Sequence, residues 1–178
     1  MNKLKFLTIS TMLLILLAAF VKVEDNQPEP RRQVEFGEKV KVSDPPCLQL
    51  YYYIERYADT FNIPKKYAYG IANAETSYKG PFHFAYNPCQ TSCAGAVGPM
   101  QVMPSTARYL NKDHCTVDQL KNDIDYNVYT SMKLLRKLYD KYGDWKTVFG
   151  CYNTGRPCVN GYAEKVYNYD FNWKTVEI

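Results

Sequence analysis

The apolar residues after position 45 recur mostly at intervals of three and four, which is typical of amphipathic helices. The longest such stretch runs from Ile124 to Tyr142 and is followed by Gly143, a residue that commonly ends helices. Earlier helices are expected to begin near Pro46, with an apolar stripe that reaches Phe61, and directly after Pro64. Shorter helices are expected to begin near Pro104, Thr116, Asp144 and Tyr162.

No stretch alternates apolar and polar residues for long enough to predict a long strand. From Phe82 to Val97 there is no helical period, and the glycines and cysteines indicate an irregular loop, with a small β element expected around Cys89–Cys93. About 130 residues are enough for one hydrophobic core. The predicted fold is therefore all-α, with one compact domain over residues 45–178 and an irregular loop that carries disulfides.

The first 21 residues resemble an export signal. Lys3 and Lys5 precede an uncharged run at residues 6–21, which is short for a membrane span of about 20 apolar residues. Ala18 and Ala19 fit a cleavage site, but no Ala-x-Ala pattern is present, so a cleaved signal peptide and an uncleaved membrane anchor through residues 6–21 both remain open. Either places the protein in the periplasm or cell envelope. Residues 22–44 are polar and predict a linker.

The six cysteines all follow the leader, and an even number in an exported chain predicts disulfides. Six cysteines allow fifteen pairings, among which the sequence does not choose. A metal site built on Cys89 and Cys93 would need ligands from His83 and His114, the two histidines of the chain, and no metal is expected. Without Lys3 and Lys5 the chain has 20 basic against 18 acidic residues, which does not favour a nucleic-acid partner.

One carboxylate lies on the apolar side of the helix predicted after Pro64. Glu75 shares this side with Ala68 and Ile71, and Gly80 and Pro81 are expected to end the helix. A buried carboxylate is costly in its charged form, so its pKa should rise and make it a proton donor near neutral pH. The helix alone favours the other interpretation, a glutamate at the edge of the core that is paired with backbone amides or with a lysine or arginine.

Three segments change this interpretation because they occur in order with suitable spacing. They are Glu75–Thr76, Gly98–Ala107 and Cys151–Gly155. Between about Pro46 and Tyr167, the chain resembles the lytic transglycosylases with a soluble lytic transglycosylase (SLT) catalytic domain, a branch of the lysozyme-like superfamily. It departs from the family pattern at Thr76 (usually Ser), at Pro99 (usually Leu), and at Cys151 and Thr154 (usually Ala).

The resemblance implies a bacterial enzyme that cleaves peptidoglycan glycan strands between N-acetylmuramic acid and N-acetylglucosamine without water or a cofactor. Glu75 would be the single acid and then the base, forming a 1,6-anhydro ring. Substrate-binding roles carry over to Thr76, Ser77, Met100, Gln101, Tyr152 and Asn153. Further candidates for stacking on sugar rings are Tyr78, Tyr86, Tyr109 and Tyr162.

The distribution of acidic residues agrees with a mechanism that uses a single catalytic carboxyl group. Most glycosidases use two carboxylates, but the segment from Thr76 to Lys112 contains neither Asp nor Glu. Two alternatives stay open. One is a muramidase that hydrolyses the same bond, and the other is a catalytically weak wall-binding module of an envelope-spanning secretion or conjugation machine.

Overall fold

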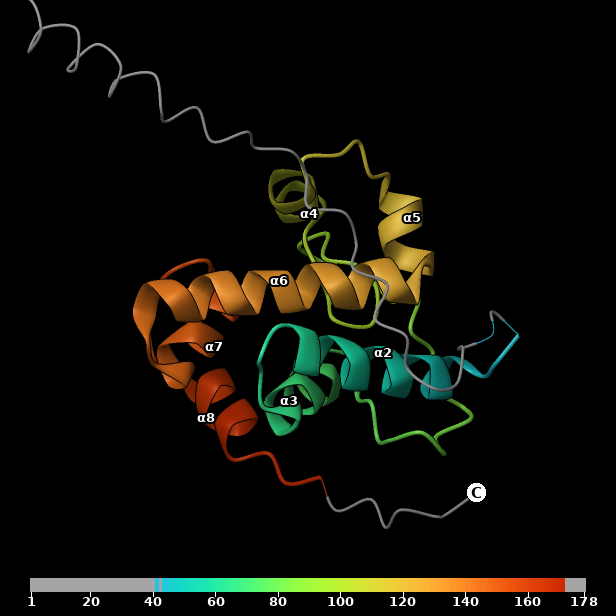
Figure 1. The fold of residues 1–178 in the computed structure, drawn as a ribbon, viewed down its shortest axis with the longest axis horizontal. Coiled ribbons are helices and arrows are strands. Elements are labelled where there is room, and N and C mark those ends of the chain that lie inside the picture. Colours follow the sequence, from blue (N-terminus) through green and yellow to red (C-terminus); the bar gives the residue numbers. More distant parts are fainter. Residues whose placement is uncertain (1–40, 42, 172–178) are drawn as a thin grey trace, which may run out of the picture. The chain divides into compact units, whose positions relative to one another are not determined.

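Helix α6 (Ile124–Tyr142) is the longest helix among the residues that the structure describes, and most of the other described helices contact it (Figure 1). The structure is a computed structural model that describes residue 41 and residues 43–171, so the predicted leader and most of the predicted linker lie outside the described residues. The other described helices are α2 (Pro46–Thr60), α3 (Lys65–Thr76), α4 (Pro104–Asn111), α5 (Val117–Asn122), α7 (Trp145–Thr154) and α8 (Gly161–Tyr167). The all-α prediction is confirmed.

The bounds of α6 follow from its sequence. The side chain of Asp123 accepts a hydrogen bond from the backbone N–H of Tyr126 and caps the first turn, and Gly143 adopts the left-handed conformation that ends the helix. The face with Val128 and Leu135 is fully buried. The predicted bounds of this helix are confirmed.

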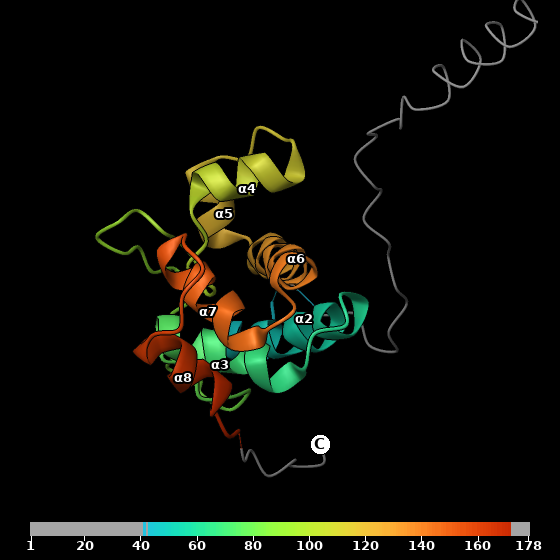
Figure 2. The same cartoon turned by 90° about the vertical axis from the view of Figure 1, so that its left-hand side faces the viewer.

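The other described helices form three pairs around α6. Helices α2 and α3 pack against each other, and α2 lies along α6, whereas α4 and α5 contact α6 from another side (Figures 1 and 2). Near the C-terminal end of α6, α7 packs on α6, and α8 packs on both α7 and α3. This arrangement brings α8 beside α3, although 84 residues separate the last residue of α3, Thr76, from the first residue of α8, Gly161.

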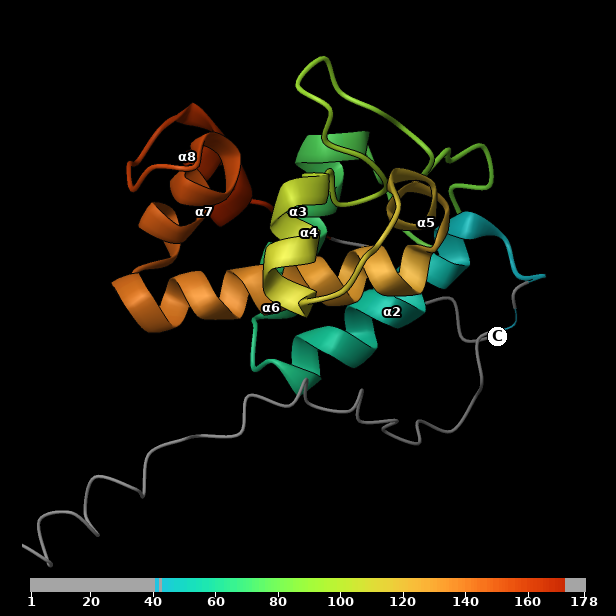
Figure 3. The same ribbon diagram turned by 90° about the horizontal axis from the view of Figure 1, so that it is seen from above.

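The connection between α3 and α4 contains no helix (Figure 3). Its β structure is limited to single bridges that pair Val97 with Thr91 and with Val102. The prediction of an irregular loop with a small β element is confirmed.

Helix α3 ends earlier than predicted. It ends at Thr76 rather than near Gly80, because Ser77 adopts a left-handed conformation with φ 58°. The N–H of Tyr78 then donates a hydrogen bond to the carbonyl oxygen of Ala72 at 3.3 Å. Tyr78 is therefore buried beyond the helix end and not on its apolar stripe.

Two other predictions are not confirmed. All six cysteines are free thiols in this structure, so the predicted disulfides stay a prediction. Within residue 41 and residues 43–171, no helix is long and apolar enough to cross a membrane. The proposed anchor at residues 6–21 lies outside that part.

Candidate active site

Glu75 lies in the last turn of α3, and its carboxylate meets a side chain from the far end of the domain. The hydroxyl of Tyr162, in α8, donates a hydrogen bond to Oε1 of Glu75 at 2.6 Å. Burial raises the pKa of Glu75 above its ordinary value of 4.5, while the hydrogen bond from Tyr162 and the positive charge of Lys165 act in the opposite direction. The net effect favours the protonated acid.

Tyr162 is suited to remain a donor. Burial, followed by the negative charge of Glu75, raises its pKa well above the ordinary value of 10. Its hydroxyl therefore keeps its proton throughout the physiological pH range. The contact is a charge-assisted hydrogen bond whenever Glu75 is ionised.

The close packing of α8 on α3 sets the position of Tyr162. A Cβ atom at Gly70, in α3, would lie 3.0 Å from both the carbonyl oxygen of Val166 and the Cβ of Tyr169, so a larger residue would push these segments apart. At the start of α8, the side chain of Asn160 accepts a hydrogen bond from the N–H of Ala163 at 2.9 Å. Glycine at position 70 and the cap together place the first turn of α8 next to Glu75.

Met100 lies in the loop on another side of the site, and both of its backbone polar groups are bonded. Its N–H donates to Oδ1 of Asn127 at 3.0 Å, and its carbonyl oxygen accepts from the hydroxyl of Tyr152 at 2.7 Å. Since Tyr152 donates here, the hydroxyl of Ser131, 2.9 Å away, is the donor in their shared bond. Burial, followed by the negative charge of Glu75, raises the pKa of Tyr152 above its ordinary value.

Asn127 holds the loop from inside the domain. It is fully buried in α6, and its Nδ2 donates to the carbonyl oxygens of Val97 at 2.9 Å and Leu120 at 2.8 Å. Gly98 makes this possible, because a Cβ there would lie 2.3 Å from Nδ2 of Asn127 and because its φ is +80°. The glycine of the second motif is thus required by packing as well as by conformation.

Thr76 is buried beneath the site. Its hydroxyl lies within hydrogen-bond distance of the carbonyl oxygens of Ala72 (3.1 Å) and Pro99 (2.9 Å) and of the hydroxyl of Tyr86 (2.8 Å). The residue that replaces the usual serine therefore joins α3 to the loop around Pro99. A direct contact of Thr76 with sugar stays a prediction.

The remaining predicted substrate-binding residues differ in exposure. Gln101 is half-buried, and its Nε2 donates to the carbonyl oxygens of Gly98 at 2.8 Å and Gln90 at 3.3 Å. Ser77 and Asn153 are exposed, and Oδ1 of Asn153 accepts from Asn160 at 3.2 Å. Asn153 thus links the end of α7 to the start of α8.

The four tyrosines proposed to stack on sugars have different surroundings. Tyr78 and Tyr86 are buried, so the proposal is wrong for them. Tyr109 is 69% exposed, on α4. Tyr162 directs its hydroxyl to Glu75, a role that the helical pattern did not indicate.

Four acidic residues between the loop and the first turn of α6 each have a local partner. Asp113 and Asp125 accept hydrogen bonds from the hydroxyls of Tyr126 and Tyr57. Asp123 caps α6, and Asp118 accepts from Asn122 at 2.8 Å. These four carboxylates are thus bonded to groups close to them in the sequence or the fold.

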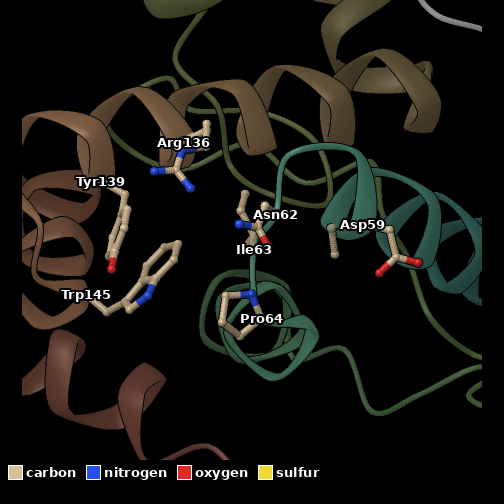
Figure 4. A pocket seen from close by; sticks show the side chains of 8 residues that line it. Asp59, Asn62, Ile63, Pro64, Arg136, Tyr139 and Trp145 are labelled. Carbon is tan, nitrogen blue, oxygen red and sulfur yellow. The ribbon is translucent and has the colours of Figure 1, made fainter.

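A hollow of about 420 Å³ lies at the opposite end of α3, near its N-cap Pro64 (Figure 4). Arg136, Tyr139 and Trp145 line one side of it. Arg136 is paired with Asp140, and Asp59, on the other side, lies 3.3 Å from Lys65. The charged groups of this hollow are therefore paired within the protein, and it is separate from the Glu75 site.

Sequence reasoning missed Asn127, and it named Tyr162 as a candidate for stacking on sugar rings but not as the donor to Glu75. Tyr162 is 87 positions from Glu75, a separation that no local pattern bridges. Asn127 did give a signal, because it is a polar residue beside Ile124 and Val128 on the apolar face of a long helix.

Comparisons with known proteins show which family and fold the chain resembles. The family model described as the transglycosylase SLT domain matches residues 52–174. A protein named transglycosylase, from Enterobacteria phage PRD1, is 32% identical over 114 residues, which are 64% of this chain and 38% of that protein.

Solved structures give the same fold. The 70 kDa soluble lytic transglycosylase Slt70 from Escherichia coli is 28% identical with a TM-score of 0.51, over 66% of this chain and 18% of that one. A structure of the 70-kDa enzyme in complex with bulgecin A matches to the same extent. An inactive mutant of the lytic transglycosylase Slt from Pseudomonas aeruginosa, 20% identical with a TM-score of 0.50 over 59% of this chain and 16% of that one, shares the fold.

This chain thus corresponds to a minor part of each of these relatives, 38% of the phage protein and 18% of Slt70. The family model, in contrast, spans nearly the whole described domain. The chain belongs to the transglycosylase SLT domain family.

Proposed function

We propose that this protein is a peptidoglycan lytic transglycosylase with Glu75 as its single acid and base. The observation that carries the proposal is a half-buried carboxyl group with a raised pKa that accepts a hydrogen bond from Tyr162, at the end of α3 in a domain of this family. A carboxylic acid that stays protonated near neutral pH is the group that glycosidic-bond cleavage needs first.

The first step is proton donation. Glu75 gives its proton to the glycosidic oxygen between N-acetylmuramic acid and N-acetylglucosamine, and the bond from that oxygen to C1 of the muramic acid breaks. The N-acetyl group of the substrate stabilises the positive charge at C1. The segment from Thr76 to Lys112 supplies no second carboxylate for this purpose.

The second step closes a ring. The ionised Glu75 takes the proton of the C6 hydroxyl of the same sugar as its oxygen bonds to C1, which gives a 1,6-anhydro end. No water is consumed, and Glu75 returns to its protonated form. The hydrogen bond from Tyr162 strengthens while the carboxylate is charged, so it stabilises the intermediate stage more than the resting acid.

The neighbouring residues bind and orient the strand. Gln101, Ser77 and Asn153 offer polar groups at the surface of the site, while Thr76 and Tyr152 hold the loop that carries Met100. The strand is the one partner that this site requires. Recruitment by an envelope-spanning secretion or conjugation machine stays a prediction.

The location follows from the leader and the substrate. The apolar run at residues 6–21, preceded by Lys3 and Lys5, supports export to the periplasm or cell envelope, with either a cleaved signal or a retained anchor. Peptidoglycan lies on that side of the membrane.

Mass spectrometry of the products tests the proposal. Purified protein incubated with peptidoglycan sacculi should release muropeptides with 1,6-anhydro ends, which are lighter than reducing ends by one water. Glu75→Gln, prepared in the same way, controls for contaminating enzymes. Reducing ends would identify a muramidase, and strand binding without any product would identify a wall-binding module.

A further inference from the structure

The connection between α7 and α8 lies directly against the backbone of α7. A Cβ atom at Gly150 would be 1.8 Å from the carbonyl oxygen of Cys158 and 3.1 Å from its Sγ atom. No side chain fits between them, so glycine at this position lets the segment that follows α7 turn back onto the helix. The thiol of Cys158 is thereby held at the surface of α7.

The residues of α7 next to this thiol are close in sequence to a second cysteine, Cys151. Oγ1 of Thr154 lies 3.6 Å from Sγ of Cys158. Thr154 is three residues after Cys151 and so on the same side of the helix, and Gly150 directly precedes Cys151. Cys151 thus lies in the same turn of α7 as Thr154, which contacts the Cys158 thiol, and directly after Gly150, where a Cβ would meet that thiol.

The segment is also held by polar contacts. Oγ1 of Thr154 lies 3.0 Å from the carbonyl oxygen of Arg156 and accepts from its N–H at 3.2 Å. Nδ2 of Asn160 donates to Asn153. These contacts keep the turn in place while both thiols are reduced, so a bond between them would form in a preordered segment.

The other cysteines have different surroundings. Cys47 donates its S–H to the carbonyl oxygen of Pro81 at 3.1 Å. Cys115 lies between α4 and α5, and Cys89 and Cys93 belong to the connection between α3 and α4. None of these segments contains the neighbours that contact Cys158.

We propose that Cys151 and Cys158 are a site of covalent modification and form a disulfide by exchange with a disulfide-bearing oxidant of the envelope. The half-buried Cys158 attacks the oxidant and forms a mixed disulfide, which releases one thiol of the oxidant. Cys151, which is 8% exposed, then attacks Sγ of Cys158 and releases the second thiol. The two cysteines lose two electrons and two protons, and the oxidant disulfide is reduced to two thiols.

The bond has a consequence for the site. It closes the turn that leads to the Asn160 cap and to Tyr162, the donor to Glu75. Oxidation therefore fixes the start of α8 relative to α7. This consequence rests on the proposed function, whereas the formation of the bond rests on export and on the packing of Cys158 against α7.

Peptide mapping of the protein recovered from the cell envelope, alkylated without reduction, tests the pairing. Trypsin should leave both cysteines in one peptide, residues 147–165, because Arg156 is followed by Pro157. That peptide should be unalkylated and lighter than its reduced form by two hydrogens. Chymotrypsin, which cleaves after Tyr152, should then give two peptides that separate only on reduction.

Thermal unfolding supplies a second readout that does not depend on wall cleavage. Reduction should lower the midpoint of the wild type by roughly 5 °C or more, because the bond constrains the unfolded chain. Cys151→Ser and Cys158→Ser should lose their sensitivity to reductant, whereas the matched loop variant Cys93→Ser should keep it. Alkylation of both thiols without reduction, or linkage of either to another cysteine, would overturn the pairing even if a variant failed to fold.

Discussion

Glu75 lies between two regions that contribute to the site in different ways. In the loop around Met100, the polar groups bond to one another. Tyr152 donates a hydrogen bond to the backbone carbonyl oxygen of Met100, and Asn127 accepts one from its N–H. In α8, one side chain, Tyr162, bonds to the carboxylate itself. The loop region sets the shape of the site, whereas the α8 region acts on the charge of the acid.

The difference is informative because the two tyrosines are alike in their surroundings. For both, burial is the largest cause of a raised pKa and the charge of Glu75 is the second. The hydroxyl of Tyr162 donates to the carboxylate of Glu75, whereas the hydroxyl of Tyr152 donates to the backbone of Met100. Substitutions at the two positions should therefore give different results.

Glu75→Gln should have the largest effect on turnover, because it removes the carboxyl group that lies between the two regions. General acid–base assistance accounts for about a hundred- to ten-thousand-fold, and one residue supplies both halves here. The rate of product release should therefore fall by about ten-thousand-fold or more. Turnover on purified peptidoglycan is the measurement, with glycan binding as the control.

The same variant should be stable. A neutral amide costs less to bury than a carboxylate, so near neutral pH its midpoint of thermal unfolding should equal or exceed that of the wild type. The raised pKa of Glu75 gives the wild type stability that is present at low pH and is lost as the pH rises through the folded pKa. Turnover near the wild-type level would refute the assignment of the acid.

Tyr162→Phe should have the next largest effect, because it removes the hydroxyl that bonds to the carboxylate. A hydrogen bond to a charged group is worth about 1.5–3 kcal/mol, so kcat should fall by about ten- to hundred-fold. The ring still fills its space, and the fold should remain. An unchanged kcat in a folded variant would show that α8 only packs against the site.

Tyr152→Phe should have a smaller effect on kcat and a visible one on stability. It removes bonds to Met100 and Ser131, both neutral groups. Neutral hydrogen bonds contribute about 0.5–1.5 kcal/mol each, so kcat should fall less than tenfold while the free energy of unfolding drops by about 1–2 kcal/mol. Denaturant unfolding checks the second figure, and a larger loss of kcat than in Tyr162→Phe would reverse the comparison.

Much of the fold was predictable because helical period and caps are local. The bounds of α6 follow from Asp123 and Gly143. The end of α3 was not predictable in this way, because the turn at Ser77 depends on Tyr78 entering the core. Gly80 and Pro81 predicted a helix end near residue 80, four residues after the observed end at Thr76.

The site was predictable where a motif carried it and not where contacts cross the domain. Glu75 and the segment around Met100 were recognised by resemblance, and the structure places both in one region with Tyr152. The bond from Tyr162 depends on the close approach of α8 to Gly70, which no local pattern reports. Burial of Tyr86 against Thr76 likewise depends on tertiary packing.

The central claim is that a buried, protonated Glu75 is the acid and that Tyr162 stabilises its charged form. The most direct test is to measure kcat/KM as a function of pH for the wild type and for Tyr162→Phe. Wild-type activity should fall as the pH rises through an apparent pKa above 4.5. Because the hydroxyl of Tyr162 stabilises the charged carboxylate and so lowers this pKa, the decline in Tyr162→Phe should move to higher pH. A decline at or below 4.5, or the same profile in both proteins, would contradict the account.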